Sequence, residues 1–308
     1  MSMEASLPAE ITPDRAVAVI GGGRMGAAIA QIFAGAGFAV HLVEPAAKVR
    51  AGLAATLATI TERRGQPAGV VERISIHDAI SDALGEAAIV IEAVTENLAL
   101  KQEIFAQLDT LCPDAILATN TSVIPVGAIG RDVKRKDRVL GAHFWNPPYA
   151  VRLVEVVQAE ATSADAVASC MALMRAIGQL PVHVRRDVPG FIGNRLQHAL
   201  KREAIALVER GICDAETVDL VVRHSFGARL GIMGPLEQSD LVGLDLTLAI
   251  HEVVLPDLDR SAEPQALLRA RVAAGKTGAA VGEGFRAWSP EAAAELRDRL
   301  DRALLKRE

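Results

Sequence analysis

The feature that most restricts the fold is a glycine-rich turn, residues 21–26 (GGGRMG), set between an apolar segment and a helical one. Residues 15–20 (RAVAVI) have the composition of a short buried strand. A helical pattern follows the turn and ends at Gly35, and a second apolar segment, residues 37–43, leads into Glu44. This order of strand, tight turn, helix, second strand and acidic residue predicts a βαβ unit at the start of an α/β domain.

The glycine spacing also predicts a dinucleotide site, because Gly21, Gly23 and Gly26 form the pattern G-x-G-x-x-G. Glycines in this pattern permit the tight turn, let the backbone approach a pyrophosphate and let the helix pack closely. The free N–H groups at the helix N-terminus favour phosphate. We therefore expect Arg24 and Met25 to lie against the cofactor together with the three glycines.

Glu44 indicates which dinucleotide binds. It lies 23 residues after Gly21, at the end of the second expected strand. A carboxylate at that place accepts hydrogen bonds from the adenosine ribose hydroxyls and repels a 2′-phosphate. The sequence therefore favours NAD over NADP.

The alternation of strands and helices continues and predicts a doubly wound, Rossmann-type parallel sheet. Further strands are expected at 71–76, 87–93, 115–118 and 138–142, and helices at 48–64 and 98–111. Ligands bind beyond the carboxyl ends of parallel strands. The residues that end or follow these strands are therefore candidates for one shared rim with the glycine turn, namely Ala93, Glu96, Asn120, Ser122, His143 and Asn146.

A histidine and a glutamate are expected to meet across a hairpin. Residues 151–157 form an apolar, β-branched run with one carboxylate, Glu155, whose burial is costly without a partner. The midpoint between His143 and Glu155 is residue 149, inside the Pro-Pro turn that follows the histidine. Pairing across this turn gives an imidazole oriented by a carboxylate, as in a general base. The alternative is a structural ion pair between Glu155 and Arg152 or another cation.

Strand signals stop near residue 187, and the remaining chain has helical patterns only. Helices are expected from Phe191 to Arg210, from Asp214 to about Val222, from Pro235 onward, and from Pro290 to Leu305. We therefore expect a flexible tail at residues 1–15, an α/β domain at 16–187 and an all-helical domain at 188–308.

Composition excludes several classes of protein. A net charge of −5 and few aromatic residues argue against nucleic-acid binding. The three cysteines and seven histidines lack the spacing of a disulfide framework or a metal site, so we expect no metal and a reducing, cytoplasmic location. No apolar run is long enough for a signal peptide or a membrane span.

Taken in order, these motifs resemble the L-3-hydroxyacyl-CoA dehydrogenase family over nearly the whole chain. The motifs are GGGRMG with Glu44, EAVTEN (92–97) with Lys101, NTS (120–122), GAHFWNPP (141–148) with LVEVV (153–157), PGFIGNRL (189–196), GPLEQSDLVGLD (234–245) and GKTGAAVGEGF (275–285). The resemblance implies an NAD-dependent oxidoreductase of fatty acid metabolism. It also implies a homodimer formed through the all-α C-terminal domain.

The resemblance assigns roles to individual residues. His143 matches the catalytic histidine, Glu155 its carboxylate partner, and Ser122 a serine that hydrogen-bonds the reacting oxygen. Asn194 matches an asparagine that lines the substrate site. Residues matched to the vicinity of the cofactor are Glu96, Lys101, Asn120 and Lys276. Structural alternatives are a turn for Ser122, a helix cap for Asn194 and a solvated surface position for Lys276.

The resemblance leaves the substrate open. Relatives of gulonate, carnitine and vitamin B6-type pyridine dehydrogenases share this core and act without CoA. Family members that use acyl-CoA hold the CoA arm with a helical hairpin after the second strand, and the segment between Glu44 and Ile74 is short for such a hairpin. The leading expectation is a 3-hydroxyacyl-CoA-like substrate, with a free small hydroxy acid or ring acid as the alternative. A further alternative is a non-catalytic NADH-binding protein of the lens-crystallin type.

Overall fold

A computed structural model describes residues 15–305 of the 308-residue chain. The chain forms two compact units, the first comprising the residues up to Arg195 together with those from Asp301 onward, and the second Leu196–Leu300. The predicted flexible tail at residues 1–15 lies outside the described residues, apart from Arg15. The predicted domain boundary near residue 187 stays a prediction.

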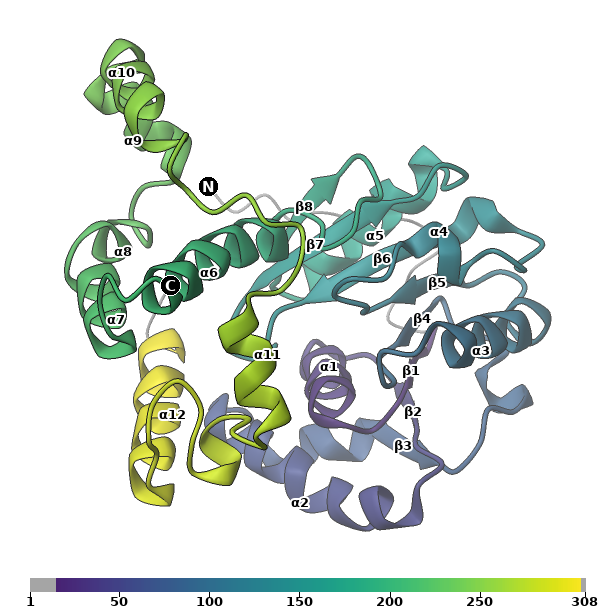
Figure 1. Ribbon diagram of the computed structural model, residues 1–308. Helices are drawn as coiled ribbons and strands as arrows, with labels where there is room; N and C mark the ends of the chain where they lie inside the picture. The colour runs from purple at the N-terminus through teal and green to yellow at the C-terminus, as the bar shows by residue number, and fades with distance from the viewer. Residues whose placement is uncertain (1–14, 306–308) are drawn as a thin grey trace. The chain divides into compact units, whose positions relative to one another are not determined.

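The first unit is built on an eight-stranded sheet in the order β3-β2-β1-β4-β5-β6-β7-β8 (Figure 1). The strands are β1 (Val17–Ile20), β2 (Val40–Val43), β3 (Ile74–His77), β4 (Ile89–Glu92), β5 (Ile116–Thr119), β6 (Val139–Phe144), β7 (Leu153–Gln158) and β8 (Leu180–Val184). Strands β1 to β6 are parallel, β7 is antiparallel to β6, and β8 is parallel to β7. Strand β1 pairs with β2 on one side and with β4 on the other, so the winding reverses there and opens a crevice at its carboxyl end.

Helices cover both faces of the sheet, which explains why its central strands are mostly apolar, with the few polar residues near their carboxyl ends. The helices of this part are α1 (Arg24–Gly35), α2 (Ala47–Arg63), α3 (Leu98–Leu111), α4 (Val126–Ile129) and α5 (Ala164–Ala176), with 3-10 turns η1 (Ala68–Arg73), η2 (Asp82–Leu84) and η3 (Lys136–Arg138). Helices α1, α2 and α5 contribute to one buried apolar cluster, and α3 and α4 to the other. The predicted doubly wound α/β domain is confirmed.

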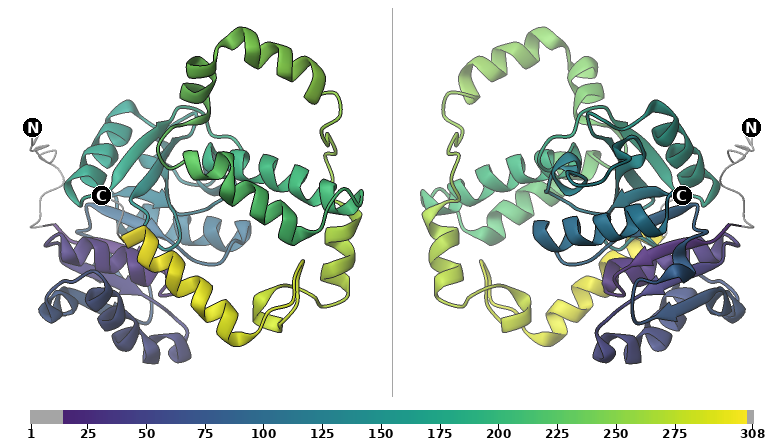
Figure 2. Two further views of the ribbon diagram at one scale, coloured as in Figure 1. Left: turned by 90° about the vertical axis from the view of Figure 1, so that its left-hand side faces the viewer. Right: turned by 90° about the vertical axis from the view of Figure 1, so that its right-hand side faces the viewer.

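The second unit is helical, as predicted. Its elements, with the two helices that join it to the first unit, are α6 (Gly193–Glu209), α7 (Ala215–His224), α8 (Phe226–Arg229), α9 (Pro235–Val242), α10 (Leu244–Val254), α11 (Ala266–Ala273), η4 (Ala279–Val281) and α12 (Pro290–Leu305). Helices α9 and α10 form an arm joined to the rest of this unit by irregular segments (Figure 2). Neither helix has a buried residue.

Several element boundaries differ from the predictions by one to three residues, and three of these differences are described here. Residues 71–73 belong to a 3-10 turn, so the third strand begins only at Ile74. Strand β6 runs on through His143 to Phe144 because its antiparallel partner β7 continues the ladder. Helix α6 begins at Gly193, two residues later than expected, because Phe191 has a positive φ of 51°. Within the described residues no helix is long and apolar enough to cross a membrane.

Candidate active site

The glycine turn has the geometry that a dinucleotide requires. Gly21 has a φ of 102°, and a Cβ there would lie 2.8 Å from the carbonyl oxygen of Ala93. A Cβ on Gly26 would overlap the carbonyl oxygen of Gly21. A Cβ on Gly23 would instead point into open space, which a pyrophosphate approaching the backbone would fill. Helix α1 has Gly23 as its N-cap, with no side-chain cap and no acid in its first turn. Its N-terminal N–H groups are thus available to phosphate.

Glu44 is anchored so that its carboxylate lies at the edge of this crevice. One oxygen accepts the N–H of Gly22 at 2.8 Å and the other accepts the N–H of Ala46 at 2.8 Å. A carboxylate has about four lone-pair sites, so both oxygens can still accept from ribose hydroxyls. These residues fit the adenosine half of NAD.

His143 and Glu155 form the predicted pair. They lie directly opposite each other in the β6–β7 ladder, and Nδ1 of His143 is 2.8 Å from Oε2 of Glu155. Both side chains are buried, with 5% and 1% of their surface exposed. This contact places the proton on Nδ1 and leaves Nε2 as an acceptor, and Nε2 makes no hydrogen bond within residues 15–305.

The second oxygen of Glu155 is bound by backbone. Oε1 accepts the N–H of Ile192 at 2.9 Å and that of Gly193 at 3.0 Å. Burial alone would raise the pKa of Glu155, but the hydrogen bonds from His143, Gly193 and Ile192 outweigh it, and the pKa is lowered. The carboxylate is therefore ionised at neutral pH and ready to stabilise an imidazolium. The alternative pairing with Arg152 is not found, because the Arg152 guanidinium donates to the carbonyl of Gly178.

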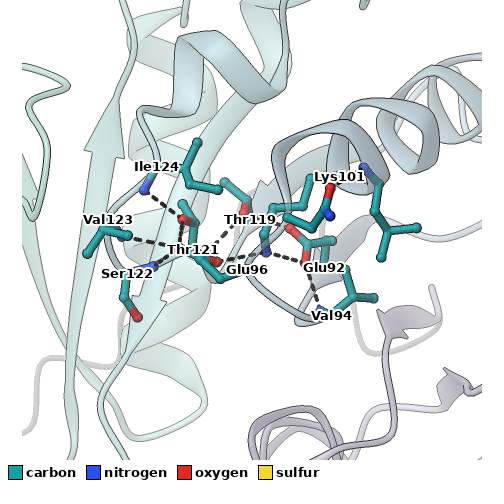
Figure 3. A network of polar contacts seen from close by, with 11 residues as sticks. Glu92, Val94, Glu96, Lys101, Thr119, Thr121, Ser122, Val123 and Ile124 are labelled. Atoms are coloured by element: carbon teal, nitrogen blue, oxygen red, sulfur yellow. Dashed lines mark hydrogen bonds and ion pairs between the residues drawn. The ribbon is translucent and has the colours of Figure 1, made fainter. Parts of the chain in front are cut away.

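A network of buried polar groups lies under the rim at the ends of β4 and β5 (Figure 3). Glu92 is fully buried and accepts hydrogen bonds from Lys101 Nζ, Thr119 Oγ1 and the N–H of Val94, each at 2.7 Å. Lys101 is also fully buried and lies 3.3 Å from a carboxylate oxygen of Glu96. The Lys101 ammonium therefore pairs with the carboxylates of Glu92 and Glu96, which is a structural role. A direct role of Lys101 near NAD stays a prediction.

Glu96 organises the loop that carries Ser122. Its carboxylate accepts the hydroxyl of Thr121 and the N–H groups of Ser122 and Val123, the latter two at 3.1 and 3.3 Å (Figure 3). Burial opposes ionisation, but these hydrogen bonds and the Lys101 charge lower the pKa of Glu96. The Ser122 hydroxyl makes no hydrogen bond in the described part of the chain and can donate to a ligand.

The remaining predicted residues lie in different surroundings. Asn120 Oδ1 accepts the N–H of Phe144 at 2.8 Å, which fixes the residue after His143. Asn194 Nδ2 donates to the carbonyl of Ser122 at 3.0 Å. Lys276 lies in the second unit, where its Nζ is 2.6 Å from Glu283. Arg24 and Asn146 are exposed, and Met25 and Ala93 are half-buried. The functional assignments of all these residues stay predictions.

Two site residues were missed from the sequence. Glu92 is a lone carboxylate in an apolar strand, the same signal that identified Glu155. Phe191 was expected inside a helix, yet its ring lies 5.7 Å from that of His143. The centroid of the Trp145 ring lies 5.3 Å from that of the same imidazole. Among the described residues no group of three or more acidic, histidine or cysteine side chains has the arrangement of a metal site.

Comparison with known families agrees with this geometry. Residues 16–188 match the family described as 3-hydroxyacyl-CoA dehydrogenase, NAD binding domain. Residues 190–288 match the family described as 3-hydroxyacyl-CoA dehydrogenase, C-terminal domain. Together the two matches cover most of the chain.

Individual relatives differ in their substrates. A 5-formyl-3-hydroxy-2-methylpyridine 4-carboxylate 5-dehydrogenase of Mesorhizobium japonicum is 36% identical and covers 90% of this chain and 92% of its own. A probable 3-hydroxybutyryl-CoA dehydrogenase of Bacillus subtilis is 39% identical, covering 87% of this chain and 96% of its own. Human mitochondrial hydroxyacyl-coenzyme A dehydrogenase is 36% identical, and the match covers 87% of this chain and 90% of the human protein.

Solved structures show the same two groups. A crystal structure of the pyridine-carboxylic acid 5-dehydrogenase, described as an NAD+-dependent dismutase, has a TM-score of 0.88 at 33% identity and covers 94% of this chain and 96% of its own. A (S)-3-hydroxybutyryl-CoA dehydrogenase from Ralstonia eutropha has a TM-score of 0.72 at 33% identity, with 89% and 99% covered.

Proposed function

The chain belongs to the 3-hydroxyacyl-CoA dehydrogenase family of NAD-dependent oxidoreductases, and from this we propose that it oxidises the hydroxyl of a 3-hydroxyacyl substrate to a ketone. The observation that carries the proposal is the buried contact between His143 Nδ1 and Glu155 Oε2, which leaves Nε2 free. A base of this kind is what removal of a hydroxyl proton needs.

The proposed chemistry divides between the chain and the cofactor. When bound, NAD supplies the hydride acceptor. Nε2 of His143 takes the hydroxyl proton as hydride leaves the same carbon. Glu155 holds the Nδ1–H tautomer and stabilises the imidazolium that forms. Ser122, whose hydroxyl has no partner in the described chain, donates to the substrate oxygen, and Asn194 helps to orient the substrate.

A second candidate is a substrate without CoA, such as a small hydroxy acid or a pyridine-carboxylate alcohol or aldehyde. Two observations favour it. The segment between β2 and β3 contains one long helix, α2, followed only by the 3-10 turn η1, with no second helix to hold a CoA arm. The pyridine-carboxylic acid dehydrogenase also has the higher TM-score of the two enzymes compared, 0.88 against 0.72.

The test is NADH formation from NAD with 3-hydroxybutyryl-CoA, free 3-hydroxybutyrate, gulonate, carnitine and a hydroxymethylpyridine carboxylate. Turnover confined to the CoA thioester supports the first candidate. Turnover of a free acid and none of the thioester replaces it with the second. Altered NADH fluorescence on binding, with no turnover of any of these substrates, supports the non-catalytic alternative and overturns both.

We also propose that two copies associate through the helical domain, which we place at residues 188–308, while residues 16–187 bind NAD. Helix α10 is apolar around most of its circumference, and its residues Leu244, Leu246, Leu248 and Val253 are 63%, 50%, 61% and 77% exposed. A helix that is apolar on all sides is normally buried. A second copy of this chain is the proposed cover.

For the cellular context we propose a cytoplasmic enzyme of fatty acid metabolism. The free cysteines Cys112, Cys170 and Cys213 fit a reducing compartment. Subcellular fractionation tests the location. Growth of a deletion strain on short-chain fatty acids tests the metabolic role, since unimpaired growth would argue against it.

A further inference from the structure

The short connection from β8 to α6, residues 185–192, has an unusual backbone at its end. Phe191 has a φ of 51° and is the one non-glycine residue with a positive φ among residues 15–305. It follows Gly190, whose φ is 75°, and its N–H donates to the carbonyl of Val188 at 3.0 Å. A bulky residue in the left-handed region is strained and persists only where its surroundings enforce it.

This backbone directs two consecutive N–H groups at one oxygen. Those of Ile192 and Gly193 lie 2.9 and 3.0 Å from Glu155 Oε1. The other oxygen, Oε2, faces His143 Nδ1 at 2.8 Å. The carboxylate is therefore held from one side by the turn and uses its other side for the imidazole.

The ring of Phe191 contacts the same histidine. It is 1% exposed, and its centroid lies 5.7 Å from that of the His143 imidazole. Trp145 contacts the imidazole as well, at 5.3 Å. A Cβ on Gly193 would overlap the Trp145 ring. Only glycine at this position lets the backbone pack this closely against the indole.

We infer that Phe191 is a positioning residue of the active site. Its left-handed backbone places the two N–H groups on Glu155, and its ring restricts the imidazole that Glu155 orients. Phe191 acts on the reaction through Glu155 and His143. This inference rests on the proposed function of that pair and adds a residue that determines its geometry.

A double-mutant cycle between Phe191 and Glu155 tests the inference. Phe191→Val introduces a β-branched residue that disfavours a positive φ. We expect kcat to fall about 10- to 100-fold, the cost of a misplacement of about 1 Å, with little change in the Kd of NADH. In a Glu155→Gln background the same substitution should lower kcat by a clearly smaller factor, because the charge that the turn positions is already gone and only the contact of the ring with the imidazole is lost.

Two further variants keep the result interpretable. Phe105→Val, in the same buried apolar cluster but on helix α3, controls for loss of core volume and should lower the thermal midpoint without lowering kcat comparably. Phe191→Leu retains most of the side-chain volume and replaces Phe191→Val in the cycle if the valine variant does not fold. Proton NMR then follows the His143 Nδ1–H, whose exchange with water should be faster in the Phe191 variant than in the Phe105 variant.

A fall in kcat of the same factor with and without Glu155→Gln would overturn the inference, as would an unchanged Nδ1–H exchange rate. Failure of the proposed function looks different, since the unmodified protein would then form no NADH or His143→Ala would retain full activity.

Discussion

Two carboxylates, Glu92 and Glu155, are buried in apolar strands of the same sheet, and each is satisfied by three donors. Glu92 binds an ammonium, a hydroxyl and an N–H, all from fixed neighbours. Glu155 binds two N–H groups on one oxygen and an imidazole on the other. The difference lies in the imidazole, because its far nitrogen remains open to a substrate. Glu155 can therefore take part in proton transfer, whereas Glu92 holds structure.

At the residue scale we expect His143→Ala to lower kcat by ~10²–10⁴-fold, the usual contribution of positioned proton transfer. The Kd of NADH should stay nearly constant, because His143 has no part in the glycine turn. Glu155→Gln should lower kcat by a smaller factor than His143→Ala. The histidine remains as a base, but its Nδ1–H tautomer and its imidazolium are less well stabilised. Steady-state kinetics with NADH titrations measures both effects, and near-normal kcat in His143→Ala would remove the histidine from the mechanism.

At the scale of elements, side chains join strands and helices that adjoin the site. Glu92 at the end of β4 accepts hydrogen bonds from Lys101 of α3 and from Thr119 of β5, and these bonds connect the three elements. The β2–β3 edge is tied by His41 Nδ1 and His77 Nε2, which lie 2.9 Å apart. The N–H of Glu44, which follows β2, donates to the carbonyl of His77 at 2.9 Å. This edge therefore supports the acid proposed to bind the ribose.

Lys101→Met should destabilise the protein strongly, by about 3–5 kcal/mol, because it leaves the fully buried Glu92 without its counter-charge. Denaturant unfolding measures the loss. Lys136→Met, at an exposed lysine of η3, is the matched control and should change the free energy of unfolding by less than about 0.5 kcal/mol. Equal effects of the two substitutions would show that the buried ion pair is not needed to balance Glu92.

The His41–His77 contact predicts a loss of stability in mild acid. Burial, and secondarily the charge of His77, lower the pKa of His41. The unfolded chain then binds the proton more readily than the folded chain. The contribution to stability is therefore fully present above the unfolded value of about 6.5 and is lost as the pH falls below it.

Urea unfolding at about pH 7.5 and about pH 5.5 measures this dependence. His41→Gln should be less sensitive to pH than the unmodified protein. His183→Gln, at an exposed histidine of β8, should keep the original pH dependence. If the free energy of unfolding of His41→Gln falls with pH as much as that of the unmodified protein, other groups cause the acid sensitivity.

At the scale of the whole molecule, the two units differ in how completely they bury their apolar residues. The first contains two continuous buried clusters, one on each face of the sheet. In the second, α7, α9, α10 and α11 have no buried residue. Such an imbalance is expected if the helical unit completes its core by association.

We therefore expect Leu248→Asp, which puts a charge on the apolar surface of α10, to shift the protein toward a single chain of 32.5 kDa in sedimentation equilibrium. Leu180→Asp, at an equally exposed leucine on β8, is the control and should leave the mass unchanged. Sedimentation of the unmodified protein as one chain would contradict the dimer directly.

The sequence by itself determined the α/β fold, the glycine turn, the position of Glu44 after the second strand and the pairing of His143 with Glu155. These depend on local spacing, strand periodicity and hairpin symmetry, which are properties of neighbouring residues. Only the tertiary structure showed that Glu92 and Lys101 form a buried ion pair. Only the tertiary structure showed that Phe191 lies outside the helix, in a turn whose N–H groups bind Glu155. Those outcomes depend on which groups meet across strands and turns far apart in the chain, where buried charges and N–H groups must find partners.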